Sequence, residues 1–349
     1  MSSVAHYQTD IFDEGHRQMF LDKHGWSIES PVGRDSSIRR YFRVNKGKQT
    51  AILMETVPDG SPYATPGHAL SDFLMVSQWL NAIGLNAPDI YEHDLENGYV
   101  LLEDFGEECF RDAAADPENI RDLYRLAADA LEHLAAQDCQ LDLPEYYESH
   151  VHRRHRRIVD WFMPLMRGRE NEAGLVEDYR AVWAEIETAL PEPSHGFLHV
   201  DFHAQNLMWL PKERGLHRCG ILDFQGAMRG PLPYDLGNLL EDARTDVPQD
   251  IKDEILEGLG ERHQAWYRVL ATQFHCRVIG QFIKQAVMDD NPSYIKHIAR
   301  LQHYLDEAMQ DSVLAPLRFW FKEQGIDFTK AADLQNLSTL EALIDDDAQ

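Results

Sequence analysis

Three polar side chains in the middle of the chain are of the types that phosphoryl transfer needs. Asp201 and Asn206 lie five residues apart in the segment His199–Asn206, and Asp223 ends the apolar run Gly220–Leu222. A carboxylate can orient and deprotonate a hydroxyl, while an amide oxygen and a second carboxylate can hold Mg²⁺ on nucleotide phosphates. The spacing therefore predicts a site with Asp201 as the base and with Asn206 and Asp223 as metal ligands.

The order of these two segments carries a family resemblance. The pattern H-x-D-x-x-x-x-N, followed by a short insert, an apolar strand and D-F, resembles the catalytic and metal-binding loops of the aminoglycoside phosphotransferase-like kinases. Protein kinases, their distant relatives, carry H-R-D-x-x-x-x-N and D-F-G. The resemblance implies an α+β, bilobal protein-kinase-like fold with a small β-rich N-terminal lobe and a larger, mainly helical C-terminal lobe. It also implies ATP and Mg²⁺ as cofactors.

The first part of the chain is expected to form the nucleotide-covering lobe, residues 1–104. The turn-rich loop Gly33–Ser37 separates two extended runs and takes the place of the loop over the phosphates, so Ser36 and Ser37 are candidate nucleotide ligands. A hairpin turn is expected at Asn45–Lys48.

The strand Gly98–Leu102 runs into a segment that in this family is the hinge, where backbone groups read adenine. Glu103 and Phe105 are therefore candidate nucleotide contacts. We expect the lobe boundary at Glu103–Gly106, with residues 105–349 forming the catalytic and acceptor-binding lobe.

The third strand departs from the protein-kinase pattern. Protein kinases place a lysine there to pair with the α- and β-phosphates, whereas this run is Ala51–Met54. Lys46, Lys48 or a basic residue of the run Arg39–Arg43 can replace it, and we expect Arg40 or Arg43 to do so. Otherwise metal and backbone amides neutralise the phosphates, or the chain is an inactive relative.

Helical periodicity predicts helices over residues 9–23, 68–83, 111–137, 174–190 and 247–309. Thr9 or Asp10 is the expected cap of the first of these. Between the two catalytic segments, Leu207–Leu210 and Cys219–Leu222 form the arms of a predicted hairpin.

The dense basic run His150–Arg157 leads into an apolar stretch at 158–166 that completes one expected helix. On such a helix Arg153 and Arg157 share a face, and Arg154 lies beside it. The run is either a solvated face paired with local acids or an anion-recognition face, since the arginine fork suits carboxylates and phosphates.

Charge and composition exclude several classes of function. The net charge of −26 disfavours nucleic acid and anionic membranes as partners. No apolar run approaches the roughly 20 residues that cross a bilayer, and residues 1–6 do not resemble a signal peptide. The four cysteines are far apart and read as reduced thiols. We expect a cytoplasmic protein, and a monomer.

Three further segments point to one branch of the family. Ser36–Arg43, Val100–Gly106 and Leu222–Pro231 are similar to the anomeric kinases of N-acetylmuramate and N-acetylglucosamine, which also carry a hydrophobic residue in place of the strand lysine. These bacterial enzymes transfer the ATP γ-phosphate to the C1 hydroxyl in cell-wall (peptidoglycan) recycling.

In this branch the resemblance implies supporting roles for His199 and Asp235 at the catalytic loop, although Asp235 could be only a helix cap. N-acetylmuramate carries a lactyl carboxylate, and Arg153, Arg154 and Arg157 are the expected cations for it.

Two other functions remain open at this stage. A kinase of a cationic acceptor, of the aminoglycoside or choline type, would be favoured by the acidic charge. Against it, charge beyond a Debye length of about 8 Å is screened, and the basic run has the wrong sign. The other is a nucleotide-binding relative without catalysis.

Overall fold

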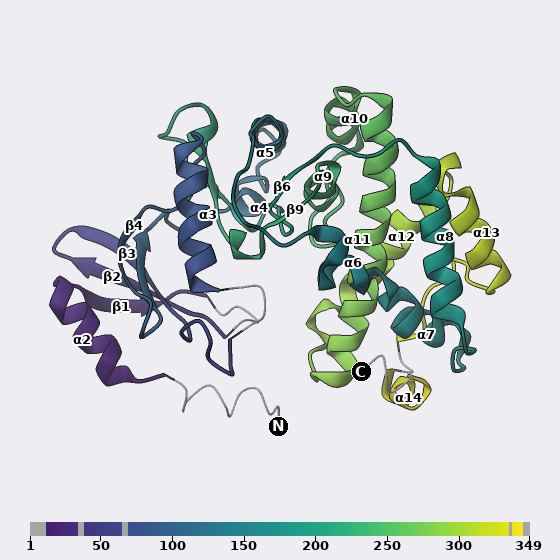
Figure 1. The fold of residues 1–349 in the computed structure, drawn as a ribbon, viewed down its shortest axis with the longest axis horizontal. Helices are drawn as coiled ribbons and strands as arrows, with labels where there is room; N and C mark the ends of the chain where they lie inside the picture. Colours follow the sequence, from purple (N-terminus) through teal and green to yellow (C-terminus); the bar gives the residue numbers. More distant parts are fainter. Residues whose placement is uncertain (1–11, 34–37, 65–68, 335–336, 345–349) are drawn as a thin grey trace. The chain divides into compact units, whose positions relative to one another are not determined.

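A computed structural model describes residues 12–33, 38–64, 69–334 and 337–344. The chain forms two compact units, one of residues 1–143 with 199–227 and the other of residues 144–198 with 228–349 (Figure 1). The N-terminal part is rich in β-strands and the C-terminal part is mostly helical, which confirms the predicted fold class. The lobe boundary at 103–106 falls inside the first unit and stays a prediction.

The first unit contains a five-stranded antiparallel sheet in the order β1-β2-β3-β5-β4. Its strands are β1 (Ser27–Pro31), β2 (Arg40–Lys46), β3 (Gln49–Glu55), β4 (Ile90–Asp94) and β5 (Tyr99–Glu103). Lys46 pairs with Gln49, so Gly47 and Lys48 form the turn, and Gly47 has the positive φ (66°) that such hairpin turns require. The predicted turn at Asn45–Lys48 is thus confirmed.

Helix α2 (Glu14–His24) packs its apolar side chains on this sheet. Phe20 and Leu21 share one core with residues of β2, β3 and β5, and Phe20 stacks on Tyr99 with 5.3 Å between ring centroids. The expected caps Thr9 and Asp10 lie outside the described residues. The N-cap in the structure is Asp13, whose carboxylate accepts from the backbone N–H of Gly15 at 2.7 Å.

Helix α3 (Leu70–Ala82) lies within the predicted range 68–83, and a residue well before its first turn caps its N-terminus. The Asp59 carboxylate accepts from the backbone N–H groups of Leu70 (2.6 Å) and Ser71 (3.1 Å). These are donors that a helix leaves without an intrahelical partner. A negative charge there also complements the helix dipole.

We expect Asp59→Ala to lower the free energy of unfolding by about 1 kcal/mol, the usual value of a cap. Asp59→Asn is the matched control, because its amide oxygen still accepts one of these bonds. Urea denaturation of both variants measures the effect, and equal stability of Asp59→Ala and wild type would show that the contact is not a cap.

The rest of the first unit corrects one predicted helix and confirms the predicted hairpin. The helix expected over 111–137 is two helices, α4 (Phe110–Ala113) and α5 (Ile120–Ala135). The break coincides with Asp116–Pro117, because a residue before proline avoids the helical conformation. Strands β7 (Leu207–Trp209) and β8 (Cys219–Ile221) pair as an antiparallel hairpin.

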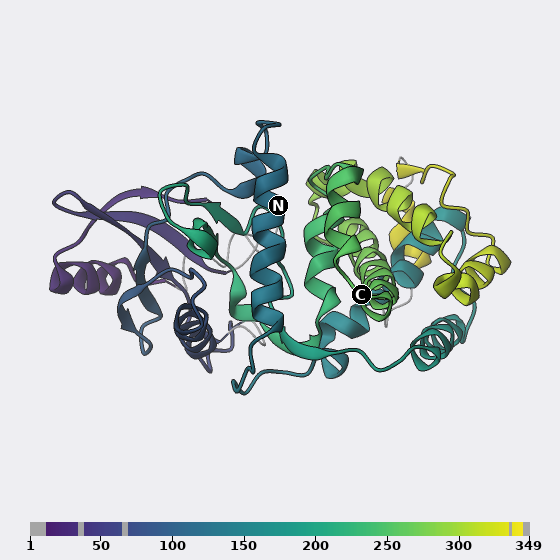
Figure 2. The ribbon, with the colours of Figure 1, turned by 90° about the horizontal axis from the view of Figure 1, so that it is seen from above.

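The second unit is mainly helical and is built around the long helix α11 (Figures 1 and 2). Its α-helices are α6 (His150–Arg153), α7 (Met163–Arg167), α8 (Leu175–Ala189), α9 (Pro233–Leu240), α10 (Gln249–Glu257), α11 (Glu261–Met288), α12 (Ile298–Ala308), α13 (Ala315–Glu323) and α14 (Leu337–Leu340). Strands β6 (His195–Leu198) and β9 (Met228–Pro231) pair antiparallel. Helix α11 packs against α9 and α12.

Two helices that the sequence predicted as continuous in this unit are interrupted in the structure. The range 247–309 is interrupted between α10 and α11, where the sequence is Gly-Leu-Gly, and again before Pro292. The range 150–166 changes from α6 to a 3₁₀ turn (Arg154–Arg156), then a π-helix (Ile158–Phe162), then α7. Pro164 directly follows the π-helix, and a proline inside a helix removes a backbone hydrogen bond and clashes with the preceding turn.

Two further expectations are tested by the fold. All four cysteines are free and buried, as expected for reduced thiols. Across the described ranges, no helix is long and apolar enough to cross a membrane.

Candidate active site

The hairpin β7–β8 brings the two predicted catalytic segments together. The Asn206 carbonyl accepts a hydrogen bond from the Leu222 amide at 2.9 Å, directly beyond the pair Leu207–Ile221. Asn206 therefore enters the hairpin opposite the residue from which Asp223 leaves it. The hydrogen bonds of this hairpin, and not a contact between distant segments, fix the distance between these two predicted metal ligands.

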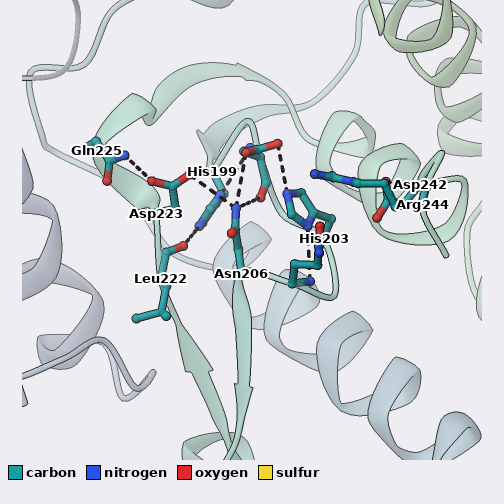
Figure 3. A network of polar contacts seen from close by, with 10 residues as sticks. His199, His203, Asn206, Leu222, Asp223, Gln225, Asp242 and Arg244 are labelled. Atoms are coloured by element: carbon teal, nitrogen blue, oxygen red, sulfur yellow. Dashed lines mark hydrogen bonds and ion pairs between the residues drawn. The ribbon is translucent and has the colours of Figure 1, made fainter. Parts of the chain in front are cut away.

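The Asn206 amide connects all three predicted side chains (Figure 3). Its Nδ2 donates to the Asp201 backbone carbonyl at 3.0 Å and lies 3.3 Å from Asp201 Oδ2 and 3.5 Å from Asp223 Oδ2. The Asp201 side chain stays half exposed. The base is thus held by a neighbouring amide and is open to a second reactant.

His199 is buried and contacts the backbone of both catalytic segments. Its Nε2 lies 2.8 Å from the Leu222 carbonyl, and its Nδ1 lies 3.3 Å from the Asp201 amide. A carbonyl can only accept and an N–H can only donate, so the neutral ring carries its proton on Nε2. Burial lowers the pKa of His199 to about 4, with the Asp201 carboxylate opposing that shift.

This pKa predicts how the stability of the protein depends on pH. The folded state keeps His199 neutral down to about pH 4, whereas in the unfolded chain it takes up a proton below pH 6.5. The contribution of neutral His199 to the free energy of unfolding is therefore complete above pH 6.5 and is lost as the pH falls toward 4. We expect this residue to account for a loss of about 2 kcal/mol between pH 7.5 and 5.

His199→Gln isolates that contribution, since its amide can still donate to the Leu222 carbonyl but does not titrate. The measurement is the free energy of unfolding in urea at pH 7.5 and at pH 5, and the variant should lose less than wild type. Equal losses would exclude His199 as the titrating group.

Two residues with unusual backbone conformations lie in the two catalytic segments. Three non-glycine residues of the described chain have positive φ, and two of them are Val200 (78°) and Asp223 (61°). Such a φ is unusual for a β-branched residue and costs of the order of 1–3 kcal/mol. Val200 directly precedes the base and Asp223 is the predicted metal ligand, so the strain lies where side-chain direction matters.

Two residues of this network were missed in the sequence. His203 is buried, and its Nε2 lies 3.4 Å from Asp201 Oδ1. The Gln225 amide donates a short hydrogen bond to Asp223 Oδ1. Each lies two residues after the acid it contacts, so the sequence shows that it is near the site but not that its side chain turns toward that acid.

The oxygens at this site fit a hard divalent metal ion. Asp223 offers a carboxylate and Asn206 an amide oxygen, which are ligands that Mg²⁺ takes together with water and phosphate oxygens. Within the described residues no group of three or more His, Cys, Asp or Glu is placed to hold a metal. The donor set therefore suits an ion shared with a nucleotide better than a closed protein site.

The two arginines expected to replace the strand lysine are both paired with carboxylates. Arg40 Nη2 lies 2.8 Å from Glu55 Oε2, which also accepts from Arg17 at 3.1 Å. Arg43 donates to Asp104 at 2.8 Å and also contacts Glu107, and the hydrogen bond to Asp104 is the main cause that raises its pKa. Two carboxylates thus neutralise the charge of Arg43. Arg17 and Arg40, in contrast, share the single buried carboxylate of Glu55. A role for Arg40 or Arg43 in binding phosphate stays a prediction.

The predicted hinge borders a cavity of about 580 Å³ in the first unit. Glu103 and Phe105 line it together with Trp209 and Leu85. The Glu103 amide donates to the Asp89 carbonyl at 2.8 Å, so this N–H is already hydrogen-bonded within the sheet. Their part in nucleotide binding stays a prediction, and Ser36 and Ser37 lie outside the described residues.

The remaining predicted residues belong to the second unit. Asp235 is buried in the first turn of α9, whose N-cap position is Leu232, so it is not the cap itself. Arg153 ends α6, Arg154 opens the 3₁₀ turn and Arg157 follows it. The single continuous helix on which the sequence placed these arginines is not formed.

Comparisons with known proteins agree with this geometry. The family model described as "Phosphotransferase enzyme family" matches residues 29–271. A protein of Caulobacter vibrioides named N-acetylmuramate/N-acetylglucosamine kinase is 30% identical to this chain, over 88% of the chain and 95% of the relative. A protein of Pseudomonas aeruginosa with the same name is 28% identical, over 80% and 83%.

Solved structures show the same fold at lower identity. The chain is similar to amicoumacin kinase in complex with AMP-PNP and Ca²⁺ (TM-score 0.57, 13% identity, 88% of this chain and 96% of that one). It is also similar to a choline/ethanolamine kinase family protein from Mesorhizobium loti (TM-score 0.56, 14% identity, 84% and 92%). A type VIII aminoglycoside-3'-phosphotransferase matches with a TM-score of 0.51 at 18% identity, over 76% and 100%.

Proposed function

The chain belongs to the phosphotransferase enzyme family, and from that premise we propose that it transfers the γ-phosphoryl group of ATP to the C1 hydroxyl of N-acetylmuramate or N-acetylglucosamine. The observation that carries this proposal is the meeting of Asp201, Asn206 and Asp223 through one amide group. The two acceptor sugars are taken from the names of the relatives.

The reaction forms one bond and breaks another. The C1 oxygen attacks the γ-phosphorus, the bond from that phosphorus to the oxygen of ADP breaks, and the hydroxyl proton passes to the Asp201 carboxylate. Asn206 and His203 orient that carboxylate, and His199 accepts a hydrogen bond from the backbone amide of Asp201. Asp201 thus acts on the acceptor and not on the nucleotide.

Asn206 and Asp223 are the residues that would hold a divalent metal, which we propose is Mg²⁺. When bound, the metal neutralises charge on the nucleotide phosphates. Gln225 keeps one oxygen of Asp223 in a hydrogen bond and so restricts the rotation of that carboxylate. We further propose that the enzyme is a monomer of the bacterial cytoplasm, acting in cell-wall recycling.

An acceptor panel tests this function. The purified protein is incubated with ATP, Mg²⁺ and one of N-acetylmuramate, N-acetylglucosamine, choline or kanamycin, and ³¹P NMR identifies the phosphorylated position. We expect a C1 phosphate on one or both sugars. Turnover of only choline or kanamycin would establish a kinase of cationic acceptors, and no turnover with any acceptor would establish an inactive relative.

A further inference from the structure

Two neighbouring arginines at the start of β2 reach different helices. In an antiparallel pair, residues directly opposite each other have their side chains on one face of the sheet. Arg40 stands opposite Glu55, and Glu55 contacts Arg17 of helix α2 at 3.1 Å. The Arg40 guanidinium therefore lies on the face that α2 covers. Arg39, one residue earlier, lies instead against helix α3.

Arg39 adjoins the position where a protein kinase has its phosphate-binding lysine. That lysine lies on the third strand, where this chain has Met54. Met54 pairs with Tyr41, so Arg39, two residues before Tyr41, approaches the end of β3 from the neighbouring strand. Its guanidinium carbon lies 5.9 Å from the centroid of the Phe73 ring on α3, a distance at which an aromatic face attracts a cation. The residue is buried, with 7% of its surface exposed.

Phe73 connects Arg39 to the predicted metal site. Its ring stacks on that of Phe224, with 4.8 Å between the centroids and 22° between the planes. Phe224 directly follows Asp223. All of these residues belong to the unit of residues 1–143 with 199–227. A single pair of stacked rings therefore links the arginine to the residue proposed to hold the metal, within one unit.

Asp59 supplies an acidic neighbour for Arg39. Burial acts to raise the pKa of Asp59, but the hydrogen bonds from Leu70 and Ser71 and then the charge of Arg39 lower it overall. In protein kinases the phosphate-binding lysine is likewise held by a carboxylate, which comes from the helix after the third strand. Here Asp59 caps that helix, α3. The acid, the helix and the arginine are thus positioned together.

We propose that Arg39 binds the α- and β-phosphates of the nucleotide, in the role that the strand lysine has in protein kinases, and that Asp59 and Phe73 position it. This assignment rests on the proposed function. An arginine suits the role, because its planar guanidinium can donate two parallel hydrogen bonds to phosphate oxygens.

Arg40 and Arg43 are the alternatives for this role. The guanidinium of Arg40 donates to Glu55 at 2.9 Å, and that of Arg43 donates to Asp104 at 2.8 Å. A phosphate would have to compete with a carboxylate for either of them. The same substitution to methionine at each of the three arginines therefore decides among them.

ADP and adenosine distinguish phosphate binding from a structural role, because adenosine carries no phosphate. Arg39→Met removes the charge, Arg39→Lys keeps the charge without the planar fork, and Arg125→Met, at an exposed position on α5 of the same unit, is the matched control. Calorimetry measures both affinities. We expect Arg39→Met to weaken ADP binding about ten- to a hundredfold and to leave adenosine binding unchanged. Arg39→Lys should weaken ADP binding less, and the control should not change it.

The same titrations in EDTA separate Arg39 from the metal site. The loss of ADP affinity in Arg39→Met should persist without Mg²⁺, because a guanidinium binds phosphate directly. An equal loss for adenosine and ADP would assign Arg39 a structural role and overturn the proposal. An unchanged ADP affinity would also overturn it, and a selective loss in Arg40→Met or Arg43→Met would then identify the arginine that binds the phosphates.

Failure of folding or of the proposed function can be recognised separately. If circular dichroism shows that Arg39→Met does not fold, Arg39→Gln, which is neutral but keeps a polar end, must show the same selective loss for ADP. If wild type binds ADP but phosphorylates neither sugar, the proposed function fails, and these affinities still test Arg39. If wild type phosphorylates a sugar and Arg39→Met binds ADP as tightly as wild type does, only the assignment of Arg39 is wrong.

Discussion

Asp201→Asn is expected to lower kcat by about 10²–10⁴, the usual contribution of a general base, with little change in the affinity for ATP. An asparagine has the same shape as the carboxylate and can accept from the Asn206 amide, which lies 3.3 Å from Asp201 Oδ2. It cannot take up the proton of the acceptor hydroxyl. The loss should therefore appear in kcat and not in the fold.

Asp129→Asn is the matched control for this change. It removes one negative charge from an exposed position on α5, within the same unit, and should leave kcat at the wild-type value. Steady-state kinetics with N-acetylglucosamine, together with circular dichroism of both variants, makes the comparison. If Asp201→Asn kept more than about a tenth of wild-type kcat, the loss would be too small for a base, and another group would have to take the proton.

Short-range contacts explain why the core of this site could be predicted from the sequence. The fixed five-residue spacing of Asp201 and Asn206 and the single hairpin before Asp223 leave little freedom in how the three side chains meet. The supporting contacts are different. That His203 turns toward Asp201 and Gln225 toward Asp223 depends on side-chain rotation in a strained loop, which periodicity does not encode.

Contacts between distant segments are what the local sequence pattern does not predict. Arg43 pairs with Asp104 across 61 residues, and its predicted role at the phosphates stays a prediction. The end of the basic run lies so close to α11 that a Cβ on Gly280 would stand 2.2 Å from the Arg157 carbonyl oxygen, whereas the break farther along that predicted helix coincides with its own Pro164. Asp104 and Gly280 lie in segments distant from the residues they contact, and their positions follow only from the assembled fold.

Asp223→Ala is expected to abolish the part of ATP binding that depends on Mg²⁺. The carboxylate is one of two protein groups proposed to hold the metal, and the other, the Asn206 amide, is neutral, so the substitution removes the only protein charge of the pair. Isothermal calorimetry of ATP binding across a Mg²⁺ titration measures this. Wild type should bind more tightly as Mg²⁺ rises, and the variant should not respond.

The positive φ of Asp223 (61°) requires a control for the backbone. Alanine is strained in this region by about 1–2 kcal/mol, whereas asparagine tolerates it and can still accept from the Gln225 amide. Asp223→Asn therefore separates the metal charge from the loop conformation. If both variants lose the Mg²⁺ response, the charge of Asp223 is responsible; if only Asp223→Ala loses it, the turn is responsible. An unchanged ATP affinity across the titration in both would exclude Asp223 as a ligand, and the metal would then have to be held from outside the hairpin that brings Asn206 and Asp223 together.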